Sequence, residues 1–165
     1  MLDIVQHFLQ NTLGGSHQEI IVFILSMTPL IELRGGIVAG YFYDFPLLKT
    51  LSLTIFANLI PIPFILFFIK HIFKWMRKHN ILTNLINKVT SRALGKSDRI
   101  KKLEFWGLIL YVGIPLPGTG AWTGALIASL LNIDIKKASL AIFLGILLAA
   151  TIMSLTTYGF IDLLF

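Results

Sequence analysis

The chain has 165 residues, of which 56% are hydrophobic and only 13% are charged. A soluble domain carries roughly twice that fraction of charged residues, so the composition excludes a soluble protein and predicts an integral membrane protein. The net charge of +6 comes mainly from lysines and arginines between residues 70 and 102, which indicates the cytoplasmic side of a membrane rather than a surface for nucleic acid.

Metal-dependent and thiol chemistry are not expected. The sequence contains no cysteine, and its four histidines show neither the HxxxH nor the HExxH spacing of metalloenzymes. An intramembrane enzyme would need a nucleophile, paired acids or a metal, and no such constellation appears in the sequence. We therefore predict no enzyme activity, no metal and no cofactor.

The first apolar stretch, residues 20–43, follows an N-terminal segment whose helical periodicity predicts an interfacial helix. Pro29, Gly35 and Gly36 interrupt the stretch, because proline removes a backbone donor and glycine loosens a helix. We expect a helix break over residues 29–36.

Both legs beside this break are short. A capping box starts the first leg near His17, and the leg must end by Thr28 because the residue before a proline is pushed out of the helical region. This leg is then ~18 Å long, about half a bilayer. With the chain resuming after Gly36, the two legs predict a re-entrant hairpin.

The charge-free run of residues 51–69 is near the ~20 apolar residues that a membrane-spanning helix needs. It ends in the basic region, so its last turn is expected on the cytoplasmic side. In the following segment, residues 76–97, Asn80 fits an N-cap and Gly95 a stop, with apolar residues on one face between them. We predict an amphipathic connector helix on the cytoplasmic surface.

A second apolar stretch, residues 105–131, is broken at its centre by Pro115 and Pro117, and the run 138–161 predicts a second span. Two lysines precede that span. They lie on the cytoplasmic side only if the broken stretch enters the membrane and returns, so the positive-inside rule favours a second re-entrant hairpin over a plain crossing.

The two halves repeat one pattern with opposite orientation, and Pro29 matches Pro115 at nearly the same offset. We predict an all-α membrane protein built as an inverted repeat, each half a re-entrant hairpin plus one transmembrane helix. Such repeats, with broken helices meeting near the midplane, are typical of secondary transporters. Within this single membrane domain, the predicted parts are residues 1–75 (first repeat), 76–97 (connector) and 98–165 (second repeat).

Glu32 and Arg34, in the first break, are the main candidates for a functional site. A charge at a helix centre in lipid costs on the order of 2.5–3.5 kcal/mol, so both should face protein or water. A purely structural ion pair is the alternative. Two states of Glu32 stay open: a desolvated carboxyl could exchange protons, whereas one paired with Arg34 would stay ionised. The guanidinium of Arg34 suits a carboxylate or phosphate.

The second break has no charge, but Gly118, Thr119 and Gly120 offer closely spaced backbone N–H groups at the start of a helical leg, where an anion can bind. A plain turn with glycine for close packing is the alternative. We expect these residues to form a substrate or proton site with Glu32 and Arg34. Asn58 and Trp122 are possible lining residues, although such side chains more often serve packing.

The motifs Pro29-Leu-Ile-Glu-Leu-Arg-Gly-Gly-Ile37 and Pro115-Leu-Pro-Gly-Thr-Gly-Ala-Trp-Thr-Gly124 resemble those of the small multi-drug export family of prokaryotic membrane proteins. The resemblance covers nearly the whole chain, with Val38 where the family commonly has proline. This family is distantly similar to the DedA/VTT superfamily, for which inverted repeats of a re-entrant hairpin plus a span are proposed. The resemblance therefore implies the same repeats here, with lipid-phosphate translocation or proton-coupled transport as the role. DedA proteins carry arginines around their second Pro-Gly motif, and this chain has none near Pro117.

The sequence therefore predicts a small multi-pass transporter in the cell membrane, with the basic segment 70–102 in the cytoplasm. Its expected function is the proton-coupled export of small amphipathic or anionic molecules. The alternative is a DedA-like flippase or scramblase for phospholipids or lipid phosphates. A structural or assembly partner would show no flux. Two full spans enclose little volume, so we expect a homodimer that contacts membrane lipids and its substrate but no nucleic acid.

Overall fold

The computed structural model describes residues 14–79, 87–88, 91 and 97–160, and this part of the chain is all-helical, as predicted. The predicted N-terminal helix and most of the connector helix lie outside the described residues. The elements are α2 (Gly14–Met27), α3 (Glu32–Phe42), α4 (Leu47–Leu59), α5 (Pro61–Lys78), α7 (Ser97–Gly113), α8 (Ala121–Leu130), α9 (Ile135–Ser154) and the π-helix η1 (Leu155–Phe160).

Residues 28–31 form the turn that joins α2 to α3. Helix α2 ends at Met27, immediately before the residue that precedes Pro29, as the restriction on that residue predicts. Its length of 14 residues is somewhat greater than expected, because it begins at Gly14. The turn and the two helices form the first hairpin.

The prediction that Gly35 and Gly36 break the helix was wrong, because α3 begins at Glu32 and continues through both. The lack of a side chain at Gly36 serves close packing instead. A Cβ at this position would overlap Ser26 Oγ of α2 and lie 2.9 Å from Thr54 Cγ2 of α4. Glycine can loosen a helix or let helices approach each other, and here the second use applies.

Helices α4 and α5 follow one another almost without interruption. Together they form the segment Leu47–Ile69, which has a mean hydropathy of 2.1 and is long and apolar enough to cross a membrane. It begins about one turn before the predicted run 51–69. Pro61 has no N–H to donate to the carbonyl of Ala57, which explains the interruption between α4 and α5.

The second half has the same order of parts. Residues 114–120, which include both prolines of the second break, join α7 to α8. The segment Ile135–Gly159, with a mean hydropathy of 2.3, is the second one long and apolar enough to cross a membrane. It starts at Asp134, whose side chain accepts hydrogen bonds from the N–H groups of Lys136 and Lys137.

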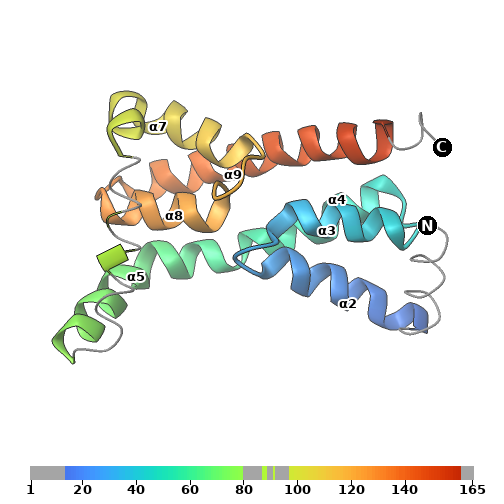
Figure 1. The fold of residues 1–165 in the computed structure, drawn as a ribbon, viewed down its shortest axis with the longest axis horizontal. Helices are drawn as coiled ribbons and strands as arrows, with labels where there is room; N and C mark the ends of the chain where they lie inside the picture. Colours follow the sequence, from blue (N-terminus) through green and yellow to red (C-terminus); the bar gives the residue numbers. More distant parts are fainter. Residues whose placement is uncertain (1–13, 80–86, 89–90, 92–96, 161–165) are drawn as a thin grey trace.

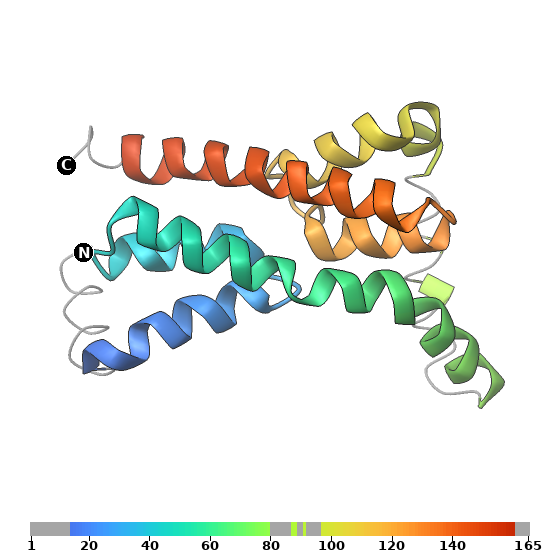
Figure 2. The same ribbon diagram turned by 180° about the vertical axis from the view of Figure 1, so that it is seen from behind.

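The two hairpins enter the molecule from opposite ends, and their turns meet near its middle (Figures 1 and 2). The start of α2 and the end of α9 lie at one end, while the end of α5 and the start of α7 lie at the other. Helix α2 packs on α4, α7 packs along α9, α3 contacts α4 and α9, and α8 contacts α5 and α9. The main buried apolar cluster joins α3, α5, α7, α8 and α9, whereas Val22 of α2 belongs to a separate cluster with Tyr43 and Phe45.

Helices α3 and α8 end in the same way. Asp44 and Asn132 follow their C-caps with left-handed φ angles of 56° and 58°. The N–H of the next residue bonds back to Gly40 O in the first case and to Ala128 O in the second, both at 3.0 Å. Aspartate and asparagine tolerate this conformation better than other non-glycine residues. The two caps therefore turn the chain from each hairpin into the long helical segment that follows.

Candidate functional site

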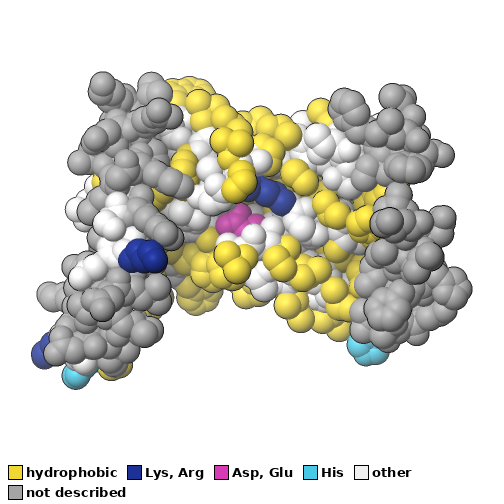
Figure 3. Space-filling view, in the orientation of Figure 1, with side chains coloured by type: hydrophobic (Ala, Val, Ile, Leu, Met, Phe, Trp, Pro, Cys, Tyr) yellow, Lys and Arg dark blue, Asp and Glu magenta, His cyan; other side chains and the backbone are white. Residues whose placement is uncertain are grey.

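Side chains cross from one hairpin to the other where the two turns meet. Glu32 and Arg34 lie in the first turn of α3, and Trp122 lies in the first turn of α8. We refer to these three residues and their contacts as the interlock. Figure 3 shows an acidic and a basic side chain near the middle of one face, surrounded by hydrophobic side chains.

Glu32 caps the first turn of α8, the second helix of the opposite hairpin. Its Oε2 accepts the N–H of Ala121 at 3.0 Å, and its Oε1 accepts the N–H of Trp122 at 3.1 Å. These N–H groups have no partner within α8, and the helix dipole favours a negative charge beside them. The Glu32 side chain is buried, and its φ of 52° lies in the left-handed region. A non-glycine residue held there costs of order 1–3 kcal/mol, which the surrounding contacts must offset.

Gly120 makes room for this carboxylate. Its φ of 137° favours glycine, and a Cβ at this position would overlap Glu32 Oε2. Helix α8 begins after Gly120, so the N–H groups that receive an anion are those of Ala121 and Trp122 rather than those of residues 118–120. In this conformation the anion is the protein's own carboxylate.

Arg34 binds the other end of the same loop. Its Nη1 donates to Leu116 O at 2.9 Å, and its Nη2 donates to Thr119 Oγ1 at 2.9 Å and to Ile114 O at 3.4 Å. Carbonyl groups at the end of α7 carry the negative end of its dipole, so a cation is favoured beside them. The guanidinium thus holds the loop to the first hairpin from the side opposite to Glu32.

Glu32 and Arg34 do not form the ion pair considered from the sequence. The salt bridge present in the described part of the chain joins Lys49 Nζ to Glu19 Oε1 at 2.5 Å, between partly exposed side chains. Glu32 instead binds the N-terminal end of α8, and Arg34 binds residues 114, 116 and 119 of the loop that precedes it. The two charges therefore serve the contact between the hairpins.

Trp122 makes the reciprocal contact. Its Nε1 donates to the carbonyl of Met27, the last residue of α2, at 3.2 Å. The second turn is also held internally, because the Tyr111 hydroxyl donates to Gly118 O at 2.7 Å. Each hairpin therefore contributes a side-chain N–H donor to the carbonyl end of the first helix of the other.

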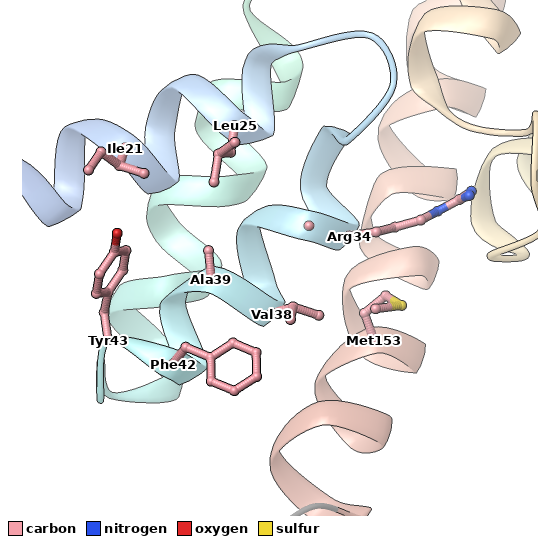
Figure 4. Close-up of a pocket in the computed structure, with 9 residues that line it drawn as sticks. Ile21, Leu25, Arg34, Val38, Ala39, Phe42, Tyr43 and Met153 are labelled. Carbon is pink, nitrogen blue, oxygen red and sulfur yellow. The ribbon is translucent and has the colours of Figure 1, made fainter. Parts of the chain in front are cut away.

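Two cavities lie beside the interlock. The first has a volume of about 520 Å³ and lies among α2, α3 and α9, where Arg34 is its one charged lining residue and Leu25, Val38 and Phe42 are typical of the rest. In Figure 4 the Arg34 side chain extends away from the other labelled residues. The second cavity, of about 490 Å³, is lined by Trp122 and apolar residues, mostly of α5. Both volumes are in the range of small-molecule pockets.

Asn58, a possible lining residue, is buried in α4, and its Oδ1 has no hydrogen-bond partner. The sequence missed the carbonyl of Met27 and the N–H of Ala121, because backbone partners have no residue-specific signature. The other predicted site residues meet at or beside the interlock: Glu32, Arg34, Gly118, Thr119, Gly120 and Trp122.

The family described as "Putative small multi-drug export protein" matches residues 32–152, well over half of the chain. The chain belongs to this family. The matched region begins at Glu32 and contains all three side chains of the interlock, those of Glu32, Arg34 and Trp122. No curated protein and no solved structure matches the chain.

The family is described as one of export proteins and is not an enzyme family. The two long apolar segments, Leu47–Ile69 and Ile135–Gly159, are consistent with that assignment.

Proposed function

We propose that this protein is a small proton-coupled transporter built as an inverted repeat, in which two re-entrant hairpins meet near the middle of the bilayer. The helix lengths support this topology. Helices α2, α3 and α8 are ~21, ~17 and ~15 Å long, too short to cross a hydrocarbon core of ~30 Å. Helix α7 is longer, but its first turns contain most of its charged residues. The segments Leu47–Ile69 and Ile135–Gly159 reach ~35 Å or more.

Equivalent positions in the two halves support the repeat. Arg34 and Trp122 are separated by the same number of residues as the left-handed caps Asp44 and Asn132. Each donates to a carbonyl at the end of the first helix of the opposite hairpin. In each half, that first helix packs on the long segment of its own half, and the second helix contacts both long segments.

The first cavity supports a small amphipathic anion as the substrate. Arg34 faces only neutral acceptors among its hydrogen-bond partners, two carbonyls and a hydroxyl. A carboxylate, sulfonate or phosphate is a stronger partner for a guanidinium than these groups are. The apolar cavity begins at the Arg34 side chain, whose guanidinium points away from it to residues 114, 116 and 119, so the hydrocarbon part of a molecule bound to the guanidinium could extend back into the cavity (Figure 4). This single cation next to an apolar cavity is the observation on which the proposal mainly rests.

The interlock provides the barrier that a transporter needs between its two sides. Its contacts join the two turns, where the ends of α2 and α7 and the starts of α3 and α8 meet. An anion that binds Arg34 would compete with the loop carbonyls for the guanidinium. Loss of those contacts would let the hairpins separate on one side. Alternating access through broken helices uses such local rearrangements.

The topology can be tested with single cysteines, because the chain has none of its own. We expect His17→Cys and Asp44→Cys, at the two ends of the first hairpin, to react with an impermeant thiol reagent from the same side of the membrane. Asn132→Cys and His79→Cys should react from the other side. All four positions are exposed in the structure. Labelling of His17→Cys and Asp44→Cys from opposite sides would contradict the re-entrant hairpin.

Transport can be tested with purified protein in liposomes. We expect faster movement of a fluorescent alkyl sulfonate than of an alkyl ammonium dye of equal chain length, and a dependence on the imposed pH gradient. Protein-free liposomes provide the control. Scrambling of a labelled phospholipid independent of the pH gradient, without sulfonate flux, would favour the flippase alternative and refute the proposed substrate. Absence of any flux would favour a structural role.

A further inference from the structure

Among the buried side-chain nitrogen and oxygen atoms of the described residues, Asn58 Oδ1 is the one without a hydrogen-bond partner. The Asn58 side chain is 2% exposed and lies in the last turns of α4, close to the interruption before Pro61. Buried acceptors in folded proteins nearly always receive a donor. An orphaned amide oxygen at this depth can accept a hydrogen bond from a donor that this conformation does not provide.

The packing of α3 against α4 allows the register of the two helices to be extended to Asn58. The two helices run in opposite directions, with Gly40 against Thr50 and Gly36 against Thr54. Each step between these pairs is four residues along both helices, about one turn. One further turn toward the middle of the molecule leads from the second pair to residues 32 and 58.

By this register Glu32 and Asn58 belong to the same level of the two helices, although the Glu32 carboxylate is directed to α8 in this conformation and no hydrogen bond joins it to Asn58. Both are buried, with exposures of 5% and 2%. Each Glu32 oxygen already accepts one backbone N–H from α8, and an ionised carboxylate has no hydrogen to donate. Each oxygen keeps a second lone pair, so one of them can take up a proton. Its O–H would then be a donor for Asn58 Oδ1.

We propose that Glu32 and Asn58 form the proton-binding site of this transporter. A proton from the aqueous side adds to a carboxylate oxygen of Glu32, the new O–H donates to Asn58 Oδ1, and release of the proton restores the carboxylate. No other bond forms or breaks. This inference rests on the proposed function, since it identifies the group that carries the coupled proton.

The electrostatic surroundings make this proton significant for the interlock. On its own helix, Arg34 is the charged group that acts on Glu32, while Asn58 of α4 and the backbone N–H groups of α8 are uncharged. Protonation leaves Arg34 with no nearby negative charge and weakens the carboxylate cap on α8, since a neutral acid is a poorer acceptor. Proton binding therefore both loosens the interlock and strengthens the attraction of Arg34 for an anion.

Infrared difference spectroscopy on the purified protein tests the site without a transport assay. A protonated-carboxyl band should appear on acidification, disappear in Glu32→Gln and persist in Glu19→Gln, which makes the same change at an exposed acid. In Asn58→Leu the band should move to higher frequency, and protonation should need about ten-fold more protons because one hydrogen bond is lost. The isosteric Thr54→Val, one turn away, should leave the band unchanged.

The same data can overturn the proposal. A band that is insensitive to Asn58→Leu, or absent from the wild type at every pH, removes the proton site. So does a band suppressed by NaCl but not by choline chloride, because the site would then bind Na⁺. If Asn58→Leu does not fold, the comparison of wild type with Glu32→Gln still decides whether Glu32 takes up the proton. A titrating, Asn58-sensitive band in a protein with no flux would retain the site and refute the transporter.

Discussion

Replacing Gly120 by alanine is expected to lower the midpoint of thermal unfolding of the purified protein by about 10 °C, equivalent to about 3 kcal/mol. The backbone of Gly120 has a φ of 137°, which alone costs a side chain of order 1–3 kcal/mol. The added Cβ would also displace the Glu32 carboxylate from the N–H groups of Ala121 and Trp122. Loss of charge-assisted hydrogen bonds adds to the destabilisation.

Gly159→Ala is the matched control, because a Cβ at Gly159 meets no atom within 4 Å. Its unfolding midpoint should stay within about 2 °C of the wild type. Thermal unfolding followed by the monomer peak in size-exclusion chromatography measures both variants. Equal stability of Gly120→Ala and Gly159→Ala would mean that the contact between Glu32 and α8 contributes nothing to the fold.

Replacing Arg34 by methionine is expected to reduce the flux of an alkyl sulfonate at least about 100-fold, equivalent to about 3 kcal/mol. Methionine keeps much of the apolar stem but removes the cation that the anion would bind. It also leaves Leu116 O and Thr119 Oγ1 without their cross-hairpin donor. Arg34→Lys should retain part of the flux, since lysine keeps the charge but not the planar fork.

Lys49→Met is the control for this substitution, since it removes a cation whose salt bridge is partly exposed. Exposed pairs contribute about 0–1 kcal/mol, so its flux should change by about two-fold at most. Rates must be normalised to folded protein in the liposomes, because Arg34→Met also loses contacts within the interlock. Unchanged sulfonate flux in folded Arg34→Met would exclude Arg34 as the substrate-binding group.

Much of the architecture could be predicted because it depends on local chemistry. Proline at position 29 determines where α2 ends, and two long apolar runs mark the segments that can cross a membrane. The role of Gly36 could not be predicted in the same way. Glycine permits both a helix break and close helix packing, and only the position of Thr54 on a neighbouring helix decides between them.

The site was harder to predict than the fold. The sequence drew attention to Glu32 and Arg34, because charges within apolar stretches are costly. It offered two states for Glu32, free or paired with Arg34, and in the structure the carboxylate binds backbone N–H groups instead. The first of these, that of Ala121, lies 89 positions further along the chain. A partner at that distance, belonging to the backbone of an alanine, leaves no trace in the local pattern of residues.

The two hairpins contribute unequally to the interlock. The positions equivalent to Glu32 and Arg34 in the second half are occupied by Gly120 and Trp122, so one hairpin supplies both charges and the other supplies neither. Two identical halves would bring two carboxylates together where Glu32 Oε2 now lies against Gly120. Like charges that close in a low-dielectric interior cannot both stay ionised. A pair of identical first halves could therefore close this centre only with one carboxyl protonated, whereas two divergent sequences allow a single ionised carboxylate to face a glycine.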